Sequence, residues 1–185
     1  MKTDSIAAAL VHWPVLDRFG KTTATAITPI DVHDFARSCA FFGIRPVYIV
    51  HPSEGMHAMV REMLAYWTRG EGAKRNPSRG KALEQVHLVR DLDVLRQECG
   101  YRLWYTSARP PVDSTVQPSA LAGMTGRHLI VFGTGHGLDA ESLPEPNGWL
   151  SPIEGEGMVR HLSVRAALAI YLDRLASRDA SSLEA

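Results

Sequence analysis

The sequence reads His128-Leu-Ile-Val-Phe-Gly-Thr-Gly-His-Gly-Leu138 in its last third, and this stretch decides the fold. Its apolar first half predicts a buried strand, and its second half predicts a glycine-rich loop at the end of that strand. The loop lacks the Lys-Ser/Thr pair that ends a P-loop. It also lacks the third glycine of the G-x-G-x-x-G pattern of a Rossmann loop. Thr134 and His136 between the glycines favour contact with a ligand, whereas the structural alternative is a tight turn.

Five further apolar runs predict the other strands of the same sheet, at residues 6–12, 46–51, 86–89, 103–106 and 149–153. Helical spacing of apolar residues lies between the runs, at residues 31–42, 53–67, 91–98 and 162–176. Gly43 directly follows the first of these helices, where a C-cap is expected. Strands that alternate with helices indicate an α/β fold with a largely parallel sheet.

Composition limits the classes of function that need to be considered. The 185 residues suffice for one domain, and the formal net charge is zero, so a polyanion would have to meet a local basic patch. Cys39 and Cys99 are too few for a disulfide framework. No apolar run approaches the roughly 18 residues that span a bilayer, and the N-terminus does not read as a signal peptide. We expect a cytoplasmic protein without a membrane partner.

Residues 69–81 predict a basic loop. The segment concentrates Arg69, Lys74, Arg75, Arg79 and Lys81 beside Tyr66 and Trp67. Arginine forks next to aromatic rings suit RNA, and a merely solvated loop is the alternative. A second connection rich in proline and arginine, at 109–119, is also expected to be a functional loop.

Two further segments carry polar residues in helical patterns. Asp34 and Arg37 are three residues apart, which predicts an ordinary surface ion pair. Ser163 is expected to cap the last helix, and core packing does not explain Arg165 early in that apolar helix. The eight histidines are scattered without the spacing of zinc ligands, so we expect no metal site.

Taken together, these segments resemble the SPOUT class of RNA methyltransferases, in particular a small bacterial branch that depends on S-adenosylmethionine. The resemblance covers nearly the whole chain. It rests on the order of six motifs: Leu10-Val-His-Trp-Pro14, Asp31-Val-His-Asp-Phe-Ala-Arg37, Asn76-Pro-Ser-Arg79, Thr106-Ser-Ala108, Phe132-Gly-Thr-Gly-His-Gly-Leu138 and His161-Leu-Ser-Val-Arg-Ala-Ala167.

The resemblance implies a single SPOUT domain over residues 1–178, followed by a polar tail at 179–185. It further implies a six-stranded, mostly parallel sheet flanked by helices, a C-terminal trefoil knot, a homodimer, and S-adenosylmethionine as methyl donor with S-adenosylhomocysteine as product. The donor would lie between three loops, at 106–109, 132–138 and 151–164, which we call the donor segments. The residues implied to hold it are Thr106, Ser107, Ala108, Phe132, Gly133, Thr134, Gly135, His136, Gly137, Leu138, Ser151, Pro152, Ile153, His161, Leu162 and Ser163.

The resemblance also implies roles in catalysis and in RNA binding. Arg37 matches an arginine that lies near the reacting hydroxyl in ribose-methylating relatives, and orienting the acceptor is its expected role, because arginine is a poor base. RNA, either tRNA or rRNA, would be held by Arg69, Lys74, Arg75, Asn76 and Arg79.

The sequence departs from the pattern of those relatives in three places. Asp31 stands where Asn is usual, a common Glu is absent near Gly135 and His136, and Ser163 and Arg165 replace the usual Asn and Ser. The acceptor therefore remains either a ribose oxygen or a base nitrogen. A knotted RNA-binding module without catalysis is the main alternative, and a methyltransferase for small molecules or proteins is a weaker one.

Overall fold

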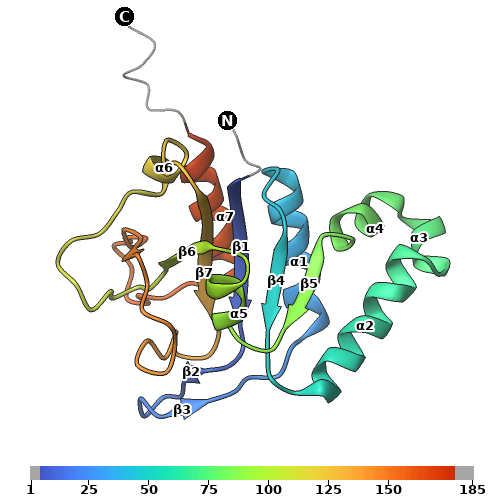
Figure 1. Cartoon of the computed structure of the whole chain (residues 1–185), viewed down its shortest axis with the longest axis horizontal. Coiled ribbons are helices and arrows are strands. Elements are labelled where there is room, and N and C mark those ends of the chain that lie inside the picture. The colour runs from blue at the N-terminus through green and yellow to red at the C-terminus, as the bar shows by residue number, and fades with distance from the viewer. Residues whose placement is uncertain (1–4, 178–185) are drawn as a thin grey trace, which may run out of the picture.

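The computed structural model describes residues 5–177, in which a six-stranded parallel sheet carries helices on both faces (Figure 1). The strand order is β5-β4-β1-β7-β6-β8, and a separate antiparallel pair joins β2 to β3. The elements are β1 (Ile6–Val11), β2 (Val15–Leu16), β3 (Thr22–Thr23), α1 (Pro29–Phe41), β4 (Val47–Val50), α2 (Glu54–Thr68), α3 (Glu71–Arg75), α4 (Pro77–Leu83), β5 (Val86–Val89), α5 (Asp93–Gln97), β6 (Tyr101–Tyr105), α6 (Pro118–Leu121), β7 (Arg127–Gly133), β8 (Gly148–Trp149) and α7 (Val164–Ala176).

The sheet has a topological switch point between β1 and β7. From β1 the chain builds outward through β4 to β5, then crosses to β6 and places β7 in the gap beside β1. Ile6 is paired with His128 and Val11 with Gly133 in this central register. In open parallel sheets, ligands bind at the carboxyl ends of the strands next to such a switch point. We call the edge of the sheet formed by the carboxyl ends of its parallel strands the carboxyl edge.

Each face of the sheet has its own apolar core, because side chains alternate along a strand. Ala8 and Leu10 of β1 face the larger core under α1 and α7, while Ala7, Ala9 and Val11 face the core under α5. Figure 1 shows α5 in front of the sheet and α1 and α7 behind it. The expected α/β sheet is therefore confirmed.

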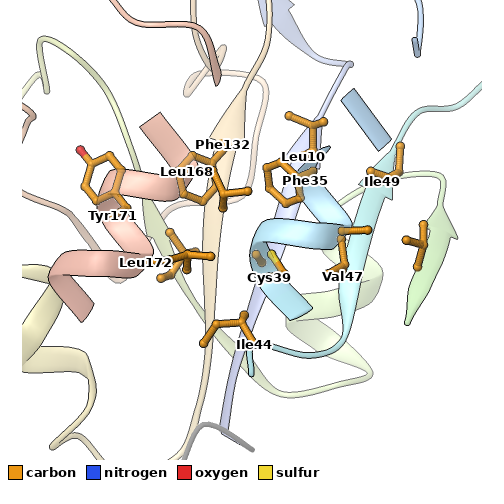
Figure 2. Close-up of a cluster of buried hydrophobic side chains, with 14 of the residues drawn as sticks. Leu10, Phe35, Cys39, Ile44, Val47, Ile49, Phe132, Leu168, Tyr171 and Leu172 are labelled. Carbon is orange, nitrogen blue, oxygen red and sulfur yellow. The ribbon is translucent and has the colours of Figure 1, made fainter. Parts of the chain in front are cut away.

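Phe132 joins the two helices of the larger core. Its ring meets Phe35 of α1 and Tyr171 of α7 edge-on, with centroids 5.6 and 5.7 Å apart (Figure 2). Phe132 is 1 % exposed and directly precedes Gly133, so the core holds the start of the glycine loop in place.

Three expectations about local structure are wrong. Residues 69–81 do not form a loop, because the segment 71–83 folds into α3 and α4. Asn76 caps α4 by accepting the Arg79 amide at 3.1 Å, and Pro77 begins the helix. The strand expected at 149–153 is only Gly148–Trp149, since Pro152 has no amide and the Ser151 carbonyl accepts the Tyr171 hydroxyl. Asp34 pairs with Arg165 of α7 rather than with Arg37.

Other expectations about local structure are confirmed. Gly43 follows α1 with a φ of 71°, as a C-cap glycine should. Ser163 caps α7, because its hydroxyl accepts the Ala166 amide at 3.3 Å. The expected boundary at residues 178–179 lies outside the described residues.

Candidate functional site

The three donor segments lie at the carboxyl edge because β7, β6 and β8 are neighbours in one parallel sheet. Residues 106–109 follow β6, residues 132–138 end β7, and residues 151–164 follow β8. Thr106 is held against β7, because both its amide and its hydroxyl donate to the Val131 carbonyl, at 3.1 and 3.0 Å. The structure thus brings together the segments that the sequence separates.

The glycines at 133 and 135 are required by close backbone packing. A Cβ atom on Gly133 would lie 2.7 Å from the Leu138 nitrogen, and one on Gly135 would lie 2.8 Å from the Leu16 carbonyl oxygen. Gly135 also has a φ of 59°, a conformation that other residues adopt only at a cost. The tight-turn alternative therefore explains these glycines without a ligand.

Several amides of the glycine loop are used within the chain. The Thr134 amide donates to Val11 at 3.1 Å, the His136 amide to Leu16 at 2.9 Å, and the Gly137 amide to Thr134 at 3.1 Å. A ligand here would therefore be bound by the remaining backbone groups of the loop and by the hydroxyls of the neighbouring segments.

A side-chain network anchors the same loop to the segment after β1. The Thr134 hydroxyl donates to the Val11 carbonyl at 3.0 Å and lies 2.5 Å from the Thr25 hydroxyl. Thr25 in turn lies 2.9 Å from Nδ1 of His12, a side chain with no exposed surface. Burial lowers the pKa of His12 to about 4, so the ring is neutral near pH 7. Thr25 could not be predicted from the sequence, because nothing in its local pattern marks it.

An ion pair between α1 and α7 explains Arg165. Its guanidinium lies 2.6 Å from Asp31 and 3.4 Å from Asp34. The Asp31 carboxylate is oriented for this contact, since its second oxygen accepts the Thr28 hydroxyl at the start of α1. Asp31 and Arg165 are two of the departures from the SPOUT pattern, and the structure shows that they are partners.

The third donor segment is anchored at its start and exposed over most of its length. Ser151 is buried and donates its amide to Val116, and its carbonyl accepts Tyr171 of α7. Residues 154–163 are exposed, including His161, Leu162 and Ser163. Pro152 and Ile153 lie between these parts and are half-buried.

The basic residues expected to bind RNA have different surroundings. Arg69 and Arg75 are exposed, whereas Lys74 pairs with Glu71 at 2.7 Å. Asn76 serves as the cap of α4. Arg79 is half-buried, with its guanidinium 4.5 Å from the centre of the Trp67 ring. Arg69 and Arg75 are therefore the cations in this set that are freest to meet a phosphate.

Arg37, the candidate catalytic residue, is exposed on α1. It lies near His33, whose pKa is lowered by burial and by the neighbouring charges of Arg79 and Arg37. His33 also contacts the Trp67 ring edge-on at 5.4 Å. Arg37 of α1 and Arg79 of α4 therefore both lie close enough to His33 to disfavour its protonated form, whereas Asp34 acts in the opposite direction.

Residues 5–177 offer neither a metal site nor a membrane-spanning helix. Within that range, no group of three or more His, Cys, Asp or Glu side chains is placed to hold a metal ion. None of the helices in this range is long and apolar enough to cross a membrane.

Comparisons with known proteins match nearly the whole chain. A family model described as SAM-dependent RNA methyltransferase matches residues 5–177. A protein of Aquifex aeolicus, described as uncharacterized, is 38 % identical over 189 residues that cover 97 % of this chain and 92 % of that protein. A tRNA (guanine-N(1)-)-methyltransferase of Oleidesulfovibrio alaskensis is 36 % identical over 92 % of this chain, but the chain spans only 42 % of that relative.

The structure of the A. aeolicus TrmH/SpoU tRNA modifying enzyme superposes with a TM-score of 0.56 at 15 % identity, over 92 % of this chain and 73 % of that one. This likeness shows the SPOUT fold.

Replacing Gly135 by alanine should distort the glycine loop, because the new Cβ would press on the Leu16 carbonyl in a left-handed conformation. We expect the free energy of unfolding to fall by about 2 to 4 kcal/mol, measured by urea denaturation. Gly155→Ala is the matched control, since its Cβ would meet no atom within 4 Å. Equal losses in the two variants would contradict the close packing at Gly135.

The Asp31–Arg165 pair should show energetic coupling in a double-mutant cycle of Asp31→Asn and Arg165→Gln. We expect a coupling of about 1 kcal/mol in the free energy of unfolding, because the two side chains are only 14 % and 31 % exposed. The exposed Glu71–Lys74 pair provides the control cycle, with an expected coupling of about 0 to 0.5 kcal/mol. If the coupling energy at Asp31–Arg165 is no larger than that of the control pair, the Asp31–Arg165 ion pair does not stabilise the fold as expected.

Proposed function

The chain belongs to the family of S-adenosylmethionine-dependent RNA methyltransferases, and from this membership we propose that it methylates a nucleotide of tRNA at the carboxyl edge of the sheet. The fold is that of the SPOUT methyltransferases, and S-adenosylmethionine is the methyl donor. The observation that carries the proposal is the family match over residues 5–177, which includes all three donor segments.

The donor segments fit S-adenosylmethionine in their chemistry. None of the residues assigned to the donor is Lys or Arg, and the two arginines of the donor segments, Arg109 and Arg160, are both exposed to solvent. The ligand has no phosphate that would need a cation. Hydroxyls of Ser107 and Thr106 and the close backbone of residues 133–138 provide small, polar walls. When bound, S-adenosylmethionine supplies an activated methyl group and leaves S-adenosylhomocysteine.

The protein's own contribution is to position the acceptor beside that methyl group. Arg37 orients a phosphate or the acceptor oxygen, which suits a permanently charged planar donor of hydrogen bonds. Arg69 and Arg75 bind the RNA backbone, together with Lys81, which is also exposed. The acceptor loses its proton to solvent or to a neighbouring group as its new bond to carbon forms.

The tRNA substrate is proposed from the name of the O. alaskensis relative, a tRNA methyltransferase. Because this chain spans 42 % of that relative, the guanine N1 acceptor does not carry over with the name. The acceptor proposed here remains a ribose oxygen or a base nitrogen of tRNA, and the site of action is the cytoplasm.

We also propose that the chain forms a knotted homodimer. The segment after β8 returns from the outer strand of the sheet to α7, which packs against α1 and β7, a path compatible with a trefoil knot.

Ile30 and Phe41 of α1 are 54 % and 83 % exposed, and Leu162 before α7 is 48 % exposed. Large apolar side chains exposed on adjacent helices favour a subunit interface. Light scattering should give the mass of a dimer, and a monomer would contradict the proposal.

Transfer of a labelled methyl group to tRNA from cells that lack this protein tests the main proposal. We expect label in one nucleoside, and mass spectrometry after cleavage of the glycosidic bond then assigns the methyl to the sugar or the base. Arg37→Ala should lower kcat/KM by about 100-fold with S-adenosylhomocysteine binding unchanged. Arg102→Ala, an exposed arginine at the opposite end of the sheet, is the control.

Three outcomes would overturn the proposal. Absence of calorimetric binding of S-adenosylmethionine and S-adenosylhomocysteine would exclude the donor site. Retention of RNA without any methyl transfer would indicate the RNA-binding module without catalysis. Label found only in protein or small molecules would identify a different acceptor.

A further inference from the structure

The segment between β1 and α1 presents aromatic and basic side chains to solvent next to the donor segments. Phe19, at the tip of the β2–β3 hairpin, is 71 % exposed, and Trp13, at its base, is 37 % exposed. The Arg18 guanidinium carbon lies 4.6 Å from the centre of the Phe19 ring. Lys21 is exposed on the same tip. Neither the core nor the donor segments account for these side chains.

The hairpin tip is an ordered turn. One carboxylate oxygen of Asp17 accepts the amides of Phe19 and Lys21, at 2.8 and 2.9 Å. The Gly20 amide donates to the Asp17 carbonyl at 3.1 Å, and Gly20 has a φ of 74°. The carboxylate of Asp17 is therefore engaged with the main chain of the turn. The side chains of Arg18 and Lys21 are exposed to solvent.

The hairpin is attached to the glycine loop by its main chain. The Leu16 amide donates to the Gly137 carbonyl, and the Leu16 carbonyl accepts the His136 amide, both at 2.9 Å. On the other strand, the Thr22 hydroxyl donates to Asp139 at 2.6 Å. Figure 1 shows the hairpin beyond the ends of the central strands. The tip is thus held at a fixed place relative to the proposed donor site.

We propose that this hairpin tip is a stacking platform for an unpaired base of the RNA substrate, with Phe19 and Arg18 as the stacking surface and Lys21 on the neighbouring phosphate. The inference rests on the proposed function, since it supplies that site with part of its substrate contact. Aromatic rings and guanidinium planes stack on bases exposed in single-stranded loops. Arg18 already lies over one face of Phe19, so a base can stack on the other face of the ring or extend the stack on the guanidinium plane.

Charge and position favour RNA over a protein partner at this surface. Within residues 5–177, Arg18 and Lys21 have no ion-pair partner, and together with the Phe19 ring they form a combination suited to a base and its phosphate. It is also continuous with the loop at which methyl transfer is proposed. A second copy of this chain or another protein would cover Phe19 as well, and the experiment below separates those cases.

Fluorescence anisotropy with a short labelled oligouridylate, and with unfractionated tRNA as competitor, tests the platform. Phe19→Ala should weaken binding by about 5- to 100-fold, the range for loss of one stacked base. Phe19→Trp should retain binding, because any large aromatic ring can stack. Arg18→Ala with Lys21→Ala should weaken binding and reduce its salt dependence, whereas Arg102→Ala should do so much less.

Each contrary result has a distinct meaning. Binding of wild type and Phe19→Ala with equal affinity would overturn the platform and leave the proposed methyl transfer intact. A changed oligomeric mass, S-adenosylhomocysteine affinity or unfolding midpoint in Phe19→Ala would overturn it in favour of a subunit contact or a structural role. Failure of the wild-type protein to methylate any RNA would instead count against the proposed function. The ratio of the RNA-binding constants of wild type and Phe19→Ala tests the platform alone, because it does not measure methyl transfer.

Discussion

The attachment of the glycine loop to the segment after β1 is the constraint on which the candidate site depends. Val11 and Leu16 provide carbonyl oxygens to this loop, and Thr134 reaches the buried His12 through Thr25. This contact explains why glycine stands where a Cβ would collide. It also fixes the β2–β3 hairpin relative to the glycine loop, because Leu16 exchanges main-chain hydrogen bonds with His136 and Gly137.

A second constraint links the first and last helices. Phe132 packs between α1 and α7, and Arg165 of α7 pairs with Asp31 and Asp34 of α1. The helix that carries the candidate catalytic arginine is therefore joined to the helix that follows the last donor segment. The last donor segment leads directly into α7, because the helix begins at Val164 with Ser163 as its cap.

The sequence predicted the central strands well, because a parallel sheet covered on both faces requires nearly continuous apolar runs. It missed β2 and β3, which are too short to show a period, and it treated α3 and α4 as a loop because basic residues hid the Asn76-Pro77 start signal. The location of the donor segments came from the family resemblance. The Asp31–Arg165 pair joins residues 134 positions apart, which no local pattern can reveal.

The central place of β7 has a consequence for how the chain reaches its native state. Val11 and the rest of β1 find one neighbour early, in β4, but their other neighbour is a strand that begins only at Arg127. Until β7 has been synthesised, the amides and carbonyls along one side of β1 have no strand to pair with. Long-range pairing of this kind slows folding and leaves an edge that other chains can join. Newly made chains are therefore most vulnerable to aggregation before the glycine loop exists.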